Sequence, residues 1–160
     1  MENKELKIKY TEYNISEINT EDENLIEKAK EAAQNSYSPY SHFKVGAAVL
    51  LENGIIIKGS NQENAAFPSS LCAERVTLFY ANATYPDIPA KILAITAFGS
   101  NNEILDEIIT PCGACRQVIL ETENRFNNNC RILLASKEKV LEFQTIKDLL
   151  PFSFGKEDLK

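Results

Sequence analysis

Two apolar runs, at residues 45–51 and 55–58, flank the dipeptide Asn53-Gly54. Such a dipeptide is a strong local signal for a β-hairpin, because asparagine and glycine tolerate the positive φ angles of a two-residue turn. A chain with this hairpin has to build a sheet around it and cover the apolar faces of that sheet with other elements.

An amphipathic helix is predicted ahead of the hairpin, at residues 21–35. Thr20 and Glu23 have the spacing of a capping box, in which two side chains satisfy free amides at a helix start. Apolar residues then recur at the spacing of one helix face, at Leu25, Ile26, Ala29, Ala32 and Ala33.

Helices and strands alternate after the hairpin. A helix should begin near Cys72, bury Val76, Phe79 and Tyr80, and end before Tyr85. The remaining predicted elements are a buried strand at 92–98, a helix at 112–123, strands at 132–135 and 140–143, and a short helix at 145–150. This order predicts an α/β fold with a mixed five-stranded sheet covered on both faces.

Residues 1–20 are predicted to be an N-terminal extension. Leu6, Ile8 and Tyr10 alternate with lysines and predict a short strand, with an irregular acidic tail as the alternative. The charged start of the sequence has no apolar stretch of the signal-peptide kind, and no apolar run approaches the ~20 residues of a membrane span. We therefore expect a cytoplasmic protein without a membrane partner.

The charge of the chain argues against a nucleic-acid partner. The formal net charge is −6, and lysines and arginines do not cluster anywhere in the sequence. Polynucleotide binding depends largely on basic contacts to phosphates, so we expect a small-molecule substrate instead.

Four cysteines are the main candidates for chemistry. Cys112 and Cys115 lie one helical turn apart at the start of a predicted helix, so their sulfurs share a face, as tetrahedral metal coordination requires. Cys72, at the start of another predicted helix, supplies a third sulfur. Alone, a C-x-x-C pair is also compatible with a structural clip or a redox pair, and Cys130 would complete a closed four-cysteine site.

Glu74 and Arg75 follow Cys72 directly and fit a catalytic metal site. Three protein ligands leave one tetrahedral position open, which distinguishes a catalytic zinc site from a structural one. Glu74 is placed to contact a water in that position without binding the metal. Three thiolates leave the site anionic, and Arg75 is our candidate for a donor to a ligand sulfur, with an ordinary surface ion pair as the alternative.

Four segments occur together in this chain: SPYSHFKVGAA at 38–48, NQENA at 61–65, CAER at 72–75 and PCGACR at 111–116. In this combination and order they closely resemble the small cytidine deaminases with an all-cysteine zinc site, and the resemblance covers residues 22–159. It implies a three-layer α/β/α fold for a catalytic domain at residues 21–160. It also implies one zinc ion per subunit and a homotetramer whose active sites borrow residues across interfaces.

The resemblance implies zinc ligation by Cys72, Cys112 and Cys115, with Glu74 as the catalytic proton carrier. The implied reaction is the hydrolytic deamination of cytidine and deoxycytidine to uridine and deoxyuridine with release of ammonia, a step of pyrimidine salvage. The alternatives are a related deaminase of another aminopyrimidine nucleoside, a polynucleotide-editing deaminase, and a non-catalytic zinc-stabilised interaction domain. No residue visibly reads the 2′-hydroxyl, so the sequence does not rank the two nucleosides.

The resemblance also implies substrate contacts. Asn61 and Glu63 would hydrogen-bond the ribose 3′-hydroxyl, with a solvated polar loop as the alternative, and Phe43 would pack against the base. The backbone carbonyl of Ala73, with that of a residue near position 110, would orient the amino group. Phe154 would stack on the pyrimidine of a neighbouring subunit, or else be buried in the core of its own chain.

Two further residues bear on the resemblance. Phe67 stands where the family commonly has tyrosine, and it lacks a hydroxyl that contributes one hydrogen bond near the sugar of an adjoining subunit's site. His42, the only histidine, is predicted not to bind the metal, because it precedes a strand far from the cysteines in sequence.

Overall fold

The computed structural model, which describes residues 1–159, contains the predicted hairpin as β2 (Lys44–Leu51) and β3 (Ile56–Ser60). Its turn is longer than the predicted two residues. The Leu51 N–H donates to the Ile55 carbonyl at 2.9 Å, so the turn comprises residues 52–54. Gly54 has a φ of 84°, the left-handed conformation that commonly ends a three-residue hairpin loop.

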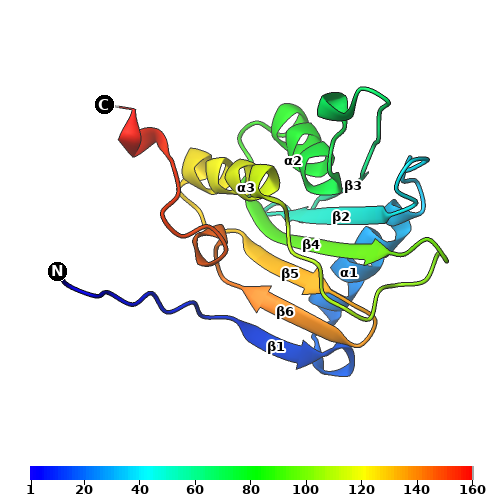
Figure 1. Cartoon of the computed structure of the whole chain (residues 1–160), viewed down its shortest axis with the longest axis horizontal. Coiled ribbons are helices and arrows are strands. Elements are labelled where there is room, and N and C mark those ends of the chain that lie inside the picture. Colours follow the sequence, from blue (N-terminus) through cyan, green and yellow to red (C-terminus); the bar gives the residue numbers. More distant parts are fainter. Residues whose placement is uncertain (160) are drawn as a thin grey trace.

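Six strands form one mixed sheet in the order β1-β6-β5-β4-β2-β3 (Figure 1). The strands outside the hairpin are β1 (Thr11–Asn14), β4 (Ala90–Phe98), β5 (Arg131–Ala135) and β6 (Lys139–Phe143). Only β4 and β5 pair in parallel. The predicted order of strands and helices is confirmed, but the predicted number of strands is wrong, because β1 adds a sixth strand beside β6.

Helices cover both faces of the sheet, which confirms the three-layer α/β/α fold (Figure 1). α1 (Thr20–Ala33) packs on one face, and α2 (Ala73–Thr84) and α3 (Gly113–Phe126) pack on the other. None of the helices formed within residues 1–159 is long and apolar enough to cross a membrane. The short helix predicted at 145–150 is only a 3-10 turn, η3 (Ile146–Asp148).

The predicted buried face of α1 is confirmed, since Leu25, Ile26, Ala29, Ala32 and Ala33 are all buried. The predicted cap is wrong by one residue. Asn19 caps the helix by accepting a hydrogen bond from the Asp22 N–H at 3.0 Å, and Thr20 is the first helical residue. Asparagine is as good a cap as threonine, so the sequence pattern alone does not separate the two.

The predicted buried face of α2 is wrong for its two aromatic residues. Phe79 and Tyr80 are 48% and 59% exposed, and the buried face is instead formed by Ala73, Glu74, Thr77, Leu78 and Ala81. The two sets of residues lie at nearly the same helical spacing, offset by about one position. Periodicity therefore does not decide which of two adjacent faces meets the sheet.

The strand predicted within residues 6–10 is displaced to β1, and residues 1–10 form neither helix nor strand. β1 pairs antiparallel with β6, and the Glu12 carboxylate accepts a hydrogen bond from Lys139 Nζ at 2.6 Å. Ile15 and Ile18, which follow β1, pack against the apolar cluster on the α1 face. The second half of the extension is thus part of the folded structure.

Gly46 lies in β2 where α1 crosses the sheet at close range. A Cβ at this position would overlap the Ala29 carbonyl oxygen and lie 2.6 Å from the Ala33 nitrogen. Gly46→Ala is therefore expected to lower the free energy of unfolding by roughly 1–3 kcal/mol, the usual cost of overpacking, measured by urea denaturation. At Gly113 a Cβ meets nothing within 4 Å, so Gly113→Ala is the control. An equal loss in both variants would contradict the close packing.

Candidate active site

The starts of two helices converge on the α2/α3 side of the sheet. Cys72 is the N-cap of α2 and Cys112 is the N-cap of α3, and neither side chain makes a capping hydrogen bond. Both sulfurs are therefore available for another role. Cys115 lies in the first turn of α3 and is buried. The N-terminal end of each helix carries partial positive charge, which favours thiolates there.

Cys72, Cys112 and Cys115 are brought together as a possible metal site, with their sulfur atoms all within 4.8 Å of one another. The Cys72 and Cys112 sulfurs are 3.8 Å apart, and those of Cys112 and Cys115 are 3.4 Å apart. Cys130 does not belong to this group; it is buried at the start of β5, where its sulfur contacts the Arg131 carbonyl. The alternative of a closed four-cysteine site is therefore wrong.

Ionisation within the cysteine group favours metal binding. The hydrogen bond with Cys115 lowers the pKa of Cys72 to about 5, against the effect of burial, and Arg75 contributes in the same direction. The same hydrogen bond, together with burial, raises the pKa of the Cys115 thiol. The lowered pKa of Cys72 favours its thiolate, the form that binds zinc.

Glu74 is buried beside the sulfurs with an acceptor that has no partner. Its side chain lies in the wall of a cavity, the residue is only 4% exposed, and Oε2 accepts no hydrogen bond within the part of the chain that the structure describes. Burial raises the pKa of Glu74, and the charge of Cys72 adds to this effect. Buried polar atoms are nearly always paired, so this oxygen is free to contact a water or a ligand in the cavity. Three convergent sulfurs next to such a carboxylate fit a zinc ion with an open position.

Arg75 directs its guanidinium toward the cysteine group. Its Nη2 atom is 3.8 Å from the Cys72 sulfur and 3.4 Å from the Ser70 carbonyl oxygen. Contact with Cys72 raises the pKa of Arg75. These contacts are those expected of a cation that offsets the negative charge of the sulfurs, rather than of a surface ion pair.

A cavity of about 650 Å³ opens over the cysteine group, a volume within the range of small-molecule sites. Its lining contains most of the predicted site residues, namely Phe43, Asn61, Glu63, Cys72, Glu74, Arg75 and Cys112. Ala73 and Phe154 are not in the lining, and Cys115 lies beneath it.

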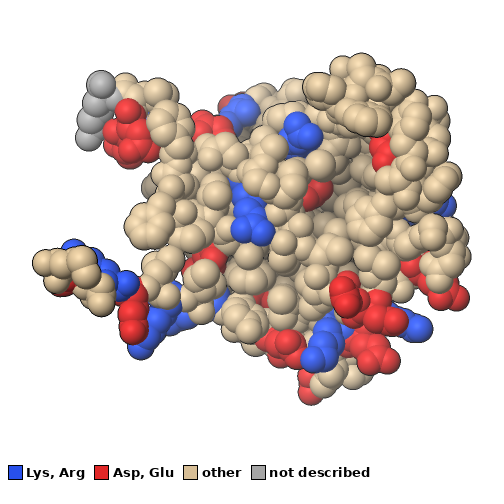
Figure 2. Space-filling model, viewed as in Figure 1, with Lys and Arg blue, Asp and Glu red and all other residues tan. Residues whose placement is uncertain are grey.

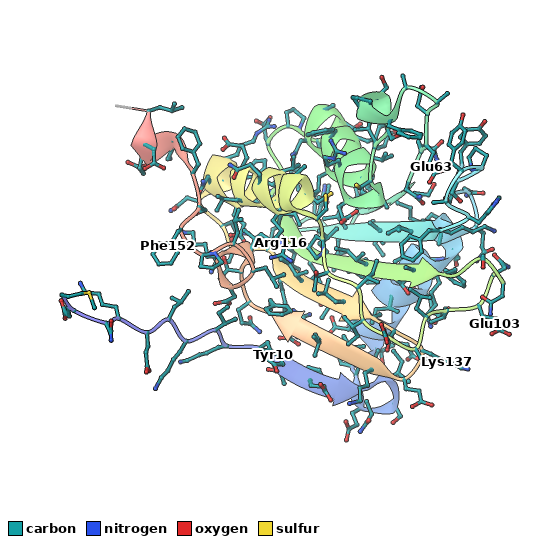
Figure 3. All side chains as sticks on the ribbon, viewed as in Figure 1. Tyr10, Glu63, Glu103, Arg116, Lys137 and Phe152 are labelled. Carbon is teal, nitrogen blue, oxygen red and sulfur yellow. The ribbon has the colours of Figure 1, made fainter. Side chains whose placement is uncertain are left out.

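Asn61 and Glu63 are engaged with the protein as well as facing the cavity. The Asn61 side chain accepts hydrogen bonds from the Val45 N–H (2.7 Å) and from Ser36 Oγ (2.6 Å). Glu63, labelled in Figure 3, accepts from the Ser41 hydroxyl and the Tyr40 N–H, and the Ser41 contact lowers its pKa. The two side chains therefore hold residues 36–45 in place, which nothing in the sequence indicated.

Ala73 is buried, and its carbonyl oxygen accepts a hydrogen bond from Thr77 Oγ1 at 2.8 Å within α2. The Ala73 carbonyl is therefore directed toward Thr77 within the helix. The expected contact of this carbonyl with a substrate amino group does not fit that direction. The first N–H groups of a helix have no acceptor within the helix, so the amide of Ala73 is the group left for a ligand.

The aromatic residues divide between the cavity and the surface. Phe43 is half-buried and lines the cavity. Phe154 is 58% exposed, so the alternative that it is buried in the core of its own chain is wrong. Phe67 is 72% exposed, and its ring packs edge-on against Tyr40 with centroids 6.0 Å apart.

Two side chains next to the metal-ligand motif were not anticipated as functional. Arg116 contacts the segment before α3, and Gln117 Nε2 donates to the Phe154 carbonyl at 2.9 Å. Their position directly after Cys115 is the one signal in the sequence that pointed to them.

Residues 19–127 match a family model described as the cytidine and deoxycytidylate deaminase zinc-binding region. A cytidine deaminase of Sporosarcina psychrophila is 40% identical over 86% of this chain and 93% of its own length. A cytidine deaminase of Halalkalibacterium halodurans is 36% identical over 84% of this chain and 95% of its own.

Solved structures agree in fold. The crystal structure of cytidine deaminase from Burkholderia pseudomallei matches with a TM-score of 0.68 at 36% identity, over 82% of this chain and 98% of that one. The crystal structure of cytidine deaminase from Mycobacterium tuberculosis matches with a TM-score of 0.66 at 30% identity, over 86% and 99%.

Proposed function

Because the chain belongs to the cytidine and deoxycytidylate deaminase family, we propose that it deaminates cytidine and deoxycytidine to uridine and deoxyuridine, releasing ammonia. The matched zinc-binding region contains Cys72, Cys112 and Cys115, and zinc is the cofactor, one ion per subunit. The observation that carries the proposal is the buried, unpartnered carboxylate of Glu74 beside these three sulfurs. A purely structural zinc domain has no use for such a group.

Glu74 is the proton carrier of the proposed reaction. When bound, the zinc ion supplies Lewis acidity that lowers the pKa of a coordinated water. Glu74 takes a proton from the attacking water at Oε2 and delivers it to the ring nitrogen beside the amino-bearing carbon. It then moves the second proton of that water to the amino group, which leaves as ammonia when the carbon–nitrogen bond breaks. Burial suits this role, because a raised pKa makes the carboxylate a better proton acceptor.

Residues on the other side of the cavity place the nucleoside for this reaction. Asn61 and Glu63 offer a donor and an acceptor to the ribose 3′-hydroxyl, and Phe43 packs against the base. The Ala73 amide serves as a donor to the pyrimidine, in place of the carbonyl that the resemblance implied. The Arg75 guanidinium offsets the negative charge of the Cys72 sulfur.

The cavity favours a nucleoside over a phosphorylated or polymeric substrate. Arg75 is the one lysine or arginine in its lining, and its guanidinium is directed to Cys72. The lining also contains the Glu63 carboxylate, which repels phosphate. The chain as a whole carries a net charge of −6, which disfavours a polynucleotide.

Zinc content and turnover measured on one purified sample test the proposed function. We expect about one zinc ion per chain and ammonia release from cytidine and deoxycytidine, with little from deoxycytidylate or a single-stranded oligonucleotide. Comparison with other aminopyrimidine nucleosides identifies the preferred substrate. Fully metallated protein that leaves every such nucleoside unchanged would refute the proposal and favour a zinc-stabilised interaction domain.

We propose that the chain assembles as a homotetramer in which Phe154 reaches the cavity of a neighbouring subunit. In support, Phe79 and Tyr80 on α2 and Phe67 ahead of it are exposed, and exposed aromatic residues are enriched at interfaces. Figure 2 shows that residues other than Lys, Arg, Asp and Glu cover most of the face over α2 and α3.

Phe154→Ala is expected to raise KM for cytidine about 2- to 10-fold, the equivalent of about 0.5–1.5 kcal/mol for one aromatic stacking contact. Phe152→Ala is the control, because Phe152 is also exposed on the same segment. Sedimentation of the wild-type protein should show a tetramer. A monomer at micromolar concentration, or an equal effect of both substitutions, would contradict the assembly.

We also propose that residues 21–160 are the catalytic domain, with residues 1–20 as an extension, and that the enzyme acts in pyrimidine salvage in the cytoplasm. All four cysteines are free, and three of them have to stay reduced to bind zinc. A reducing compartment suits this requirement.

A further inference from the structure

One wall of the cavity lies in a segment that has neither helix nor strand. Ile109 and Thr110 form this wall, and Pro111 follows them without an N–H to donate. Within the described part of the chain, both hydrogen bonds recorded for residues 108–111 come from Arg116. Its Nε donates to the Pro111 carbonyl (2.8 Å) and its Nη2 to Thr110 Oγ1 (3.1 Å). Ile108, just ahead of the wall, packs against the core, and Arg116 is the residue that holds Thr110 and Pro111 by hydrogen bonds.

Arg116 is tied at its other end to the buried core. Its Nη1 donates to the Leu149 carbonyl at 2.6 Å, and the buried Leu149 donates its own N–H to the Ile146 carbonyl. The Ile146 N–H donates in turn to the buried carboxylate of Glu123 at 3.0 Å. Figure 3 shows Arg116 between α3 and the turn that contains η3. The guanidinium thus connects the cavity wall to the η3 turn, which Glu123 holds against the core.

Geometry rather than charge explains an arginine at this position. All three recorded partners are uncharged oxygens, and no ion pair among the described residues includes Arg116. A planar guanidinium directs its nitrogens at several acceptors at once, whereas the ammonium group of lysine is a point charge on a flexible stem. A lysine carries its donors on one nitrogen and cannot reproduce the contacts that three separate guanidinium nitrogens make here.

We propose that Arg116 is a positioning residue for the deamination reaction, since it fixes the Ile109–Thr110 wall relative to Glu74. This inference rests on the proposed function, and Arg116 itself is not among the residues that line the cavity. A shift of about 1 Å in a reacting geometry can cost about 10²-fold in rate, so Arg116→Gln should lower kcat about 10- to 100-fold. KM should change much less, because Asn61 and Glu63 bind the sugar independently of this wall.

The test compares Arg116→Gln and Arg116→Lys with Arg125→Gln and Arg125→Lys. Arg125 is on the same helix and donates a single hydrogen bond, to the Pro86 carbonyl at 2.7 Å. Three quantities are measured for each zinc-loaded variant: zinc per chain, kcat and KM for cytidine, and amide hydrogen exchange at residues 108–112 and in β4. We expect both Arg116 variants to keep zinc, lose kcat and exchange faster at 108–112, while the Arg125 variants match the wild type.

Several results would overturn the proposal. These are unchanged kcat in both Arg116 variants, full rescue by lysine, or loss of zinc in proportion to loss of activity. Faster exchange throughout β4 in both variants would also overturn it, because Arg116 would then act on global stability. If the wild-type enzyme fails to deaminate cytidine, the proposed function fails, while the exchange measurement still decides whether Arg116 holds the wall.

Discussion

Glu74→Gln is expected to lower kcat for cytidine by about 10²–10⁴-fold or more, the usual contribution of a general acid–base group. The amide has the shape of the carboxylate but cannot accept and return a proton. Zinc should remain bound, because the three sulfurs are untouched. Any loss of stability should be small, since Oε2 of Glu74 has no hydrogen bond to lose among the described residues. The measurement is steady-state kinetics with zinc content and thermal unfolding on the same sample.

The control for this substitution is Glu103→Gln, an exposed glutamate on the loop after β4. It makes the same chemical change away from the cavity and should leave kcat at the wild-type value. Turnover by Glu74→Gln within about tenfold of wild type would exclude Glu74 as the only proton carrier, because the expected loss is at least about 10²-fold.

Cys115→Ala is expected to abolish zinc binding and turnover together, and to destabilise the protein. Cys115 is buried under the cavity, and its loss leaves two ligands where tetrahedral zinc needs three from the protein. Metal binding to the folded state adds its free energy to folding, so the loss should appear as a lower Tm. Chelation of zinc from the wild-type protein should lower Tm as well. Elemental analysis and thermal unfolding measure both effects.

Cys130→Ala is the matched control, since Cys130 is equally buried but outside the sulfur group. It should retain one zinc ion per chain and lose only the packing of a small side chain. Loss of zinc in this variant would show that Cys130 is a ligand. A full complement of zinc in Cys115→Ala would show that Cys115 is not one.

The order of strands and helices was predictable because burial between layers leaves clear hydrophobic patterns in the sequence. β2 and β4 are nearly continuous apolar runs, and α1 has an apolar face at helical spacing. The position of β1 was not predictable, because it is an edge strand with mostly exposed side chains, and only its pairing with β6 defines it. The exposure of Phe79 and Tyr80 was missed for a related reason, since a helix period does not say which face meets the sheet.

The metal-binding part of the site was predictable because two of its spacings are local, and the resemblance joined the two cysteine segments into one site. Cys112 and Cys115 are one turn apart in one helix, and Glu74 is two residues from Cys72. The supporting contacts were not predictable, because they join segments far apart in the chain. Arg116 contacts Leu149, and Asn61 contacts Ser36. The hydrophobic pattern of the sequence does not indicate which partner such a polar side chain will bind.

The N-terminus leaves the sheet beyond β1, the strand farthest from β3 (Figure 1). The cavity lies at the other side of the molecule, among the residues that flank β2, β3 and the starts of α2 and α3. An affinity tag or a solid support linked to residue 1 would therefore be held away from the opening. A catalyst immobilised through this end should present its pocket to the solution.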